Sequence, residues 1–94
     1  MVTKGKKIDI YQEAPTVEQY FYLHNGTPIK SLAELIDQLI NMEQELFCYH
    51  VHSKNNDFAN WIRDVFGAKE LARRIKMSHS APGMLKSITK YLES

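Results

Sequence analysis

The sequence predicts a mainly α fold, a compact bundle of four to five short helices with a short N-terminal β-hairpin or extended arm. Three observations support this prediction. Apolar residues recur at helical spacing in several stretches, capping residues precede those stretches, and an aromatic segment ends at an Asn-Gly turn. The chain has 94 residues, 44% of them hydrophobic, which suffices for one small core. We expect a basic, partly flexible arm over residues 1–18 and a single helical domain over residues 19–94.

The first regular element expected is a hairpin. The aromatic-rich segment 19–24 is typical of a strand. Asn25-Gly26 follows it and favours a tight turn, because both residues tolerate positive φ. Pro28 lacks a backbone N–H, so the returning strand is expected to be short and to lie at an edge.

Ser31 begins the clearest helix. Ser31 and Glu34 have the spacing of a capping box, in which each side chain bonds a backbone N–H that the helix leaves unpaired. Apolar residues then follow at the spacing of one helical face, namely Leu32, Leu35, Ile36, Leu39 and Ile40.

Residues 43–53 are ambiguous. A strand would place Phe47, Tyr49 and Val51 on one face, whereas a helix would align Met42, Leu46 and Tyr49. We favour a second helix, or a continuation of the first, because few helix-breaking residues occur between positions 31 and 51.

Three further helices follow from the same patterns. One carries Phe58, Trp61, Ile62, Val65 and Phe66, with Asn56 or Asp57 as its N-cap and Gly67 at its left-handed end. The next carries Leu71, Ala72 and Ile75, and the last, after Ser80–Gly83, carries Met84, Leu85, Ile88, Tyr91 and Leu92. The expected core consists of Leu35, Leu39, Phe58, Trp61, Ile62 and Phe66.

The expected location is the cytoplasm. No apolar run approaches the roughly 18–20 residues of a membrane-spanning helix, and no signal-peptide apolar region follows the basic start. The lone Cys48 cannot form an internal disulfide and fits a reducing compartment.

The net charge of +1 conceals an uneven distribution. Residues 8–53 hold seven acids and one lysine, whereas residues 54–94 hold eight basic and four acidic residues. An acidic first half and a basic second half are compatible with a charged partner.

The basic half suggests a helix-turn-helix as an alternative. Residues 70–78 and 84–90 resemble its two helices, with Ala72 at the close crossing. Two features argue against this motif. Pro82-Gly83 lies where the recognition helix should begin, and Lys76 replaces the usual turn glycine. The candidate nucleic-acid contacts are Arg73, Arg74, Lys76, Lys86 and Lys90, which could equally form a solvated face or pair with the acidic half of another copy.

Cys48-x-His50-x-His52 is the strongest candidate for metal chemistry. Cys48 and His52 share a face in a helix or a strand, and zinc accepts thiolate and imidazole ligands. His24, His79 or Asp57 would have to complete the site, and the alternative is a small cysteine beside histidines at a helix end. No activated nucleophile, carboxylate pair or phosphate-binding glycine loop is evident. We therefore predict no catalytic, cofactor-binding or metal-binding residue, and keep a zinc-binding or enzymatic role as a second alternative.

Three stretches carry a family resemblance: Phe21-x-Leu23-x-x-Gly26-x-x-Ile29-x-Ser31-Leu32-x-Glu34-Leu35, Phe47-x-x-His50-Val51 and Asn56-Asp57-Phe58-Ala59-x-Trp61-Ile62-x-Asp64-Val65. Together they resemble a family of small archaeal and bacterial domains of unknown function, over about residues 19–76. The resemblance implies a compact, self-contained module. It points to His50, Asn56 and Asp57 as positions with a role, and these three residues and Trp61 are the candidate interaction or structural residues. Our interpretation is that Asp57 caps the helix 58–66 and that His50 is hydrogen-bonded nearby.

The function predicted from the sequence is therefore that of a small, non-enzymatic cytoplasmic interaction or adaptor module. Its expected partner is a protein, including a second copy of the chain. A nucleic-acid partner is the alternative, and no membrane or cofactor is expected.

Overall fold

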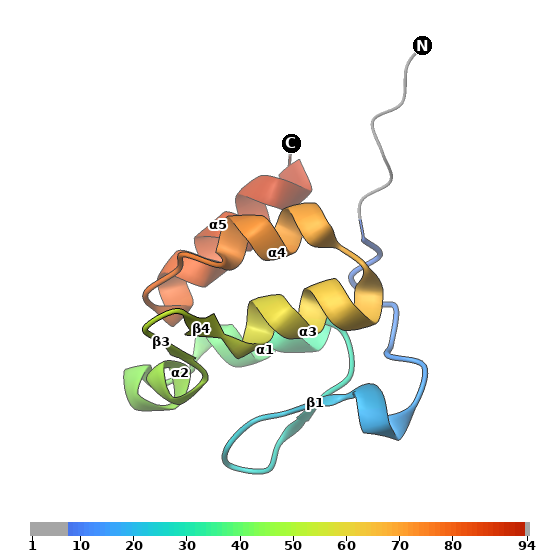
Figure 1. The fold of residues 1–94 in the computed structure, drawn as a ribbon, viewed down its shortest axis with the longest axis horizontal. Coiled ribbons are helices and arrows are strands. Elements are labelled where there is room, and N and C mark those ends of the chain that lie inside the picture. Colours follow the sequence, from blue (N-terminus) through green and yellow to red (C-terminus); the bar gives the residue numbers. More distant parts are fainter. Residues whose placement is uncertain (1–7, 94) are drawn as a thin grey trace.

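The computed structural model describes residues 8–93 and contains five helices (Figure 1). They are α1 (Leu32–Ile40), α2 (Gln44–His50), α3 (Asp57–Phe66), α4 (Lys69–Ile75) and α5 (Ala81–Glu93). The prediction of a mainly α bundle with a short N-terminal hairpin is confirmed. Among the described residues, none of the helices combines the length and apolar character that crossing a membrane requires.

Three helix–helix contacts define two layers. Helix α3 packs against α4, α4 against α5, and α5 against α1. In Figure 1 the α3–α4 pair faces the viewer, while α1 and α5 lie behind it. The core lies between the layers and includes the fully buried side chains of Leu35, Phe47, Phe58, Ile62 and Met84.

The N-terminal hairpin consists of β1 (Phe21–Tyr22) and β2 (Pro28–Ile29), which pair antiparallel. Its loop is closed by the Leu23 N–H, which donates to the Thr27 carbonyl at 2.9 Å. Gly26 has φ 93°, but Asn25 is not in the left-handed region, contrary to the expectation for both residues. The loop is therefore a three-residue connection that ends in a glycine, rather than a two-residue turn.

Helix α1 begins at the predicted cap. The Ser31 hydroxyl accepts from the Glu34 N–H at 3.3 Å, and the Glu34 carboxylate accepts from the Lys30 N–H at 2.8 Å. This second bond reaches one residue further back than in the standard capping box. Ile40, which was expected on the apolar face, is 59% exposed, because eight residues of helix rotate it about 80° away from Leu32.

Residues 43–53 form a helix followed by a strand. The favoured prediction of a second helix is confirmed as α2, which ends at His50. The chain then becomes extended as β3 (Val51–His52), which pairs antiparallel with β4 (Asn55–Asn56). Ser53 adopts φ 50° in the tight turn between them. The segment fitted both a helical and an extended pattern because the helix α2 is followed directly by the strand β3.

Residues 8–20 run past the start of α1. The Ile10 carbonyl accepts from the Ala33 N–H at 2.7 Å, and the Ala14 N–H donates to the Lys30 carbonyl at 2.8 Å. A 3-10 turn, η1 (Val17–Gln19), leads into β1. Residues 1–7 of the expected arm lie outside the described residues, so the division at residue 18 stays a prediction.

Candidate functional site

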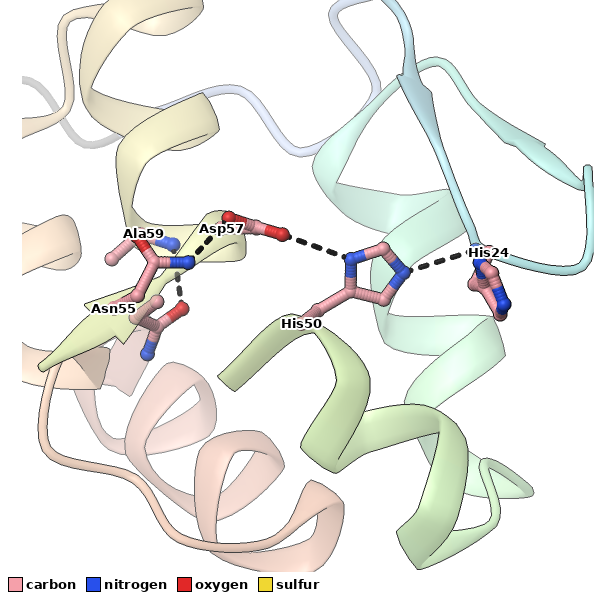
Figure 2. Close-up of polar contacts among 6 residues, drawn as sticks. His24, His50, Asn55, Asp57 and Ala59 are labelled. Carbon is pink, nitrogen blue, oxygen red and sulfur yellow. Dashed lines mark hydrogen bonds and ion pairs between the residues drawn. The ribbon is translucent and has the colours of Figure 1, made fainter. Parts of the chain in front are cut away.

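His50 lies at the junction of three elements (Figure 2). Its ring, at the end of α2, is 4% exposed. Nδ1 lies 3.1 Å from Asp57 Oδ2, and Nε2 accepts from the backbone N–H of His24 at 3.0 Å. Because a backbone N–H can only donate, Nε2 carries no proton, so the ring proton is on Nδ1 and is donated to Asp57.

Aromatic rings enclose the same imidazole. The centroid of His50 lies 5.0 Å from that of Phe21 and 5.4 Å from that of Phe58. Asp57 also accepts from Asn55 Nδ2 at 2.8 Å, so its carboxylate is oriented by two partners. The hairpin, α2 and α3 are thus held together through one side chain.

This geometry favours a structural role for His50. A histidine that transfers protons or binds a metal needs a free ring nitrogen. Both ring nitrogens of His50 already bond to protein groups. The interpretation that His50 is hydrogen-bonded near the start of α3 agrees with these contacts.

Asn56, rather than Asp57, caps α3. Its Oδ1 accepts from the Ala59 N–H at 3.0 Å, and the side chain is buried. The interpretation that Asp57 is the cap is wrong, because Asp57 already lies in the helix and its carboxylate faces His50. At the other end of α3, Gly67 has φ 66° and forms the predicted left-handed terminus.

Trp61 joins α3 to residues 8–20. Its Nε1 donates to the Gln19 carbonyl at 2.7 Å, and its ring packs edge-on against Phe21 and Phe66. The residues to which the family resemblance points therefore contact other elements of the fold rather than a common cavity.

Cys48, His50 and His52 do not form one group. Cys48 and His52 line a hollow of about 280 Å³, together with His79, whereas His50 bonds to Asp57 and His24 elsewhere. Gln44 Nε2 donates to Cys48 Sγ at 3.2 Å and to the His79 carbonyl at 3.1 Å. Within residues 8–93, no three His, Cys, Asp or Glu side chains gather in a way that could hold a metal ion.

The candidate nucleic-acid contacts are divided between surfaces. Arg73 and Lys76 line a groove between α3 and α4, whereas Arg74 lines a hollow on the α5 side. Lys86 and Lys90 are exposed on α5. Pro82 and Gly83 lie in the first turn of α5, which begins at Ala81 rather than at Met84.

The groove between α3 and α4, hereafter the α3–α4 groove, is the most distinctive charged feature. It encloses about 310 Å³, and its floor includes the small buried side chains of Ala59 and Ala72. Five cationic side chains line it, from the β3–β4 turn, α3, α4 and the end of α4: Lys54, Arg63, Lys69, Arg73 and Lys76. Asn55 and Asn60 add amide groups, and no acid lines it.

Nearby acids compensate only part of this charge. Asp64 pairs with Arg63 at 2.9 Å and raises the pKa of that guanidinium. Hydrogen bonds from Arg74 and Arg73 lower the pKa of Glu70. Within the described part of the chain, no ion pair involves the remaining three groove cations, Lys54, Lys69 and Lys76.

The acidic half of the sequence lies elsewhere. A separate hollow of about 440 Å³, between the end of α1, the start of α2 and the β1–β2 turn, is lined by Asp37 and Glu43 and by no cation. Two of the seven acids of residues 8–53 thus gather at a hollow separate from the basic groove.

The sequence contained part of the signal for the groove. Lys69, Arg73 and Lys76 are spaced i, i+4 and i+7, which places them on one helical face. Lys69 was nevertheless not among the candidates, and neither were Lys54 and Arg63. Only the packing of α3 on α4 and the position of the β3–β4 turn bring Lys54 and Arg63 to that face.

Comparison with known proteins adds no further assignment. No family model, curated protein or solved structure matches this chain. The resemblance to the family of small prokaryotic domains stays a prediction, and the function must be inferred from the geometry of the chain itself.

Proposed function

We propose that this protein is a non-enzymatic interaction module that binds an acidic segment of a protein partner in the α3–α4 groove. The observation that carries the proposal is the gathering of five cations around a groove with no acid in its lining. Lysine and arginine form charge-assisted hydrogen bonds with carboxylates, and a cationic groove attracts an acidic partner before contact.

Two features support binding rather than catalysis. Both ring nitrogens of the buried His50 are bonded to protein groups. The groove itself presents only ammonium, guanidinium and amide groups beside two alanines, a set without a general base at neutral pH.

The shape of the groove favours an acidic peptide over nucleic acid. Duplex DNA is read by an element that protrudes into the major groove, whereas these cations surround a concave floor. Single strands bind on aromatic stacking platforms, and none of the residues lining the groove is aromatic. A second copy of the chain is one source of acidic surface, since residues 8–53 hold seven of its acids.

The test measures the affinity of a fluorescein-labelled oligoglutamate peptide by fluorescence anisotropy at low and high salt. We expect Lys69→Gln/Lys76→Gln to weaken binding about tenfold or more. Lys86→Gln/Lys90→Gln removes the same charge from exposed positions on α5 and should leave the affinity nearly unchanged.

Equal affinities for the two double variants, or no binding by the wild-type protein, would overturn the proposal. Tighter binding of single-stranded or duplex DNA through the same groove would replace it with nucleic-acid binding, recognisable by a steep linear dependence of log affinity on log salt. Molar mass from light scattering at two protein concentrations tests whether a second copy is the partner.

We also propose a cytoplasmic location. Cys48 is exposed and unpaired, which suits a reducing compartment. Fractionation of the native host, with detection of the protein in the soluble cytoplasmic fraction, tests this; recovery from an oxidising compartment would contradict it.

A further inference from the structure

The α3–α4 groove continues into a second hollow. Asn55 and Lys76 line both the groove and the hollow of about 280 Å³ that contains Cys48, hereafter the Cys48 hollow. Figure 1 shows why: the β3–β4 hairpin and the loop between α4 and α5 meet at the same end of the α3–α4 pair. A single extended ligand can therefore reach from one hollow to the other past Lys76.

The two hollows differ in chemistry. The only apolar side chains lining the groove are two alanines, whereas Cys48, Val51 and Met77 contribute apolar surface to the Cys48 hollow. Met77 is 71% exposed although it is apolar. Methionine and arginine are both enriched in protein-contact sites, which commonly have an apolar centre and a polar rim.

A hydroxyl in the Cys48 hollow also lacks a partner. Ser78 lines the hollow, and its Oγ is buried with no hydrogen-bond partner among the described residues. An unpaired buried hydroxyl is unfavourable, so a ligand that supplies an acceptor for it would gain binding free energy.

From these three observations we propose that the groove and the Cys48 hollow form one elongated site for a linear segment of the partner. Acidic residues of the segment lie along the groove, and an adjacent aliphatic side chain of the segment enters the Cys48 hollow against Met77. Rotation of the Ser78 side chain turns its hydroxyl, which is buried in the free protein, toward a backbone carbonyl of the segment, and that carbonyl accepts the hydrogen bond. This inference rests on the proposed function, and it adds a specificity that charge alone does not provide.

The test compares labelled oligoglutamate with the same peptide extended by leucine at its C-terminus, and separately at its N-terminus. We expect one leucine peptide to bind about tenfold more tightly than oligoglutamate. Met77→Ser should abolish that advantage and leave oligoglutamate binding unchanged. The matched control is Ile40→Ser, which replaces another exposed aliphatic residue, on α1, and should change neither affinity.

Alkylation of Cys48 gives a second readout, because it is the only cysteine in the chain. The leucine peptide should slow its reaction with a maleimide, and oligoglutamate at equal occupancy should protect it less. Ser78→Ala should weaken binding of the leucine peptide without lowering the thermal unfolding midpoint of the free protein. If the hydroxyl had a structural role instead, its removal would lower that midpoint.

The outcomes separate the two proposals. If all three peptides bind equally tightly through the groove, or if Cys48 reacts at the same rate with each peptide bound, the elongated site is wrong and the acidic-partner function stands. If no peptide binds, both proposals fail. If binding requires Met77 but not the groove cations, the hollow binds apolar segments and the acidic specificity is wrong.

Discussion

Asn56 Nδ2 donates to the backbone carbonyl of Ile75 at 3.0 Å, so the first turn of α3 and the last turn of α4 share one buried amide. The other end of the same amide, Oδ1, caps α3. This side chain thereby joins the two helices that form the walls of the α3–α4 groove. Asn56 and Ile75 are 19 residues apart in sequence.

Asn56→Ala is expected to lower the free energy of unfolding by about 1–3 kcal/mol, because it removes a helix cap and the hydrogen bonds that Nδ2 donates to the Ile75 and Lys76 carbonyls. Asn56→Ser keeps a capping hydroxyl but loses the bond to Ile75, and should lose less. Urea unfolding followed by circular dichroism measures both. Equal losses for the two variants would mean that the cap contributes nothing.

His50→Phe is expected to lower the free energy of unfolding by about 1–3 kcal/mol. The variant keeps a ring between Phe21 and Phe58 but removes the hydrogen bonds to Asp57 and to the His24 backbone. His52→Phe is the matched control, since His52 is exposed on β3. Nitrogen chemical shifts of the wild-type ring should identify the neutral tautomer with the proton on Nδ1. A proton on Nε2 would contradict the arrangement of Figure 2.

Glu70→Gln is expected to remove a small part of the pH dependence of stability. Hydrogen bonds from Arg74 and Arg73 lower the pKa of Glu70 in the folded protein. Its contribution to stability is therefore present above the unfolded pKa and is lost as the pH falls through the lower folded pKa. Because the group is exposed, salt should reduce the effect. Thermal midpoints measured from neutral to acidic pH test this, and Glu93→Gln on α5 is the control that should leave the profile unchanged.

Trp61→Phe is expected to loosen residues 8–20 from the helices, because the bond from Nε1 to the Gln19 carbonyl is lost. Limited digestion with a glutamate-specific protease should then cut faster after Glu13 and Glu18, with the sites mapped by mass spectrometry. Tyr49→Phe changes an exposed aromatic residue elsewhere and should leave the rate unchanged. An unchanged rate in Trp61→Phe would mean that other contacts hold this segment.

The helices were predictable because their signals are local. Ser31 with Glu34, Asn56 as one of two cap candidates, and Gly67 each cap their helix through backbone groups within five residues of themselves. The apolar face of α1 was also predictable, except at Ile40, where the helix has rotated away from the core. Residues 43–53 were harder to interpret, because the helix is short and changes to a strand at Val51.

The candidate site was only partly predictable. The basic spacing of Lys69, Arg73 and Lys76 lies within one helical face and can be read along the chain. Lys54 and Arg63 join them only after α3 has packed against α4. Of the five nucleic-acid contacts predicted on α4 and α5, only Arg73 and Lys76 line the groove.

The sequence by itself determined the start of α1, both ends of α3 to within one residue, and most of the apolar faces, because these depend on spacings of one or two helical turns. It also determined that the acidic and basic residues occupy different halves of the chain. The tertiary structure alone decided that Asn56 bonds to Ile75, that His50 bonds to the His24 backbone 26 residues away, and that five cations share one groove. Such pairings depend on how the elements pack, since residues far apart in sequence meet only after the core has brought their helices together.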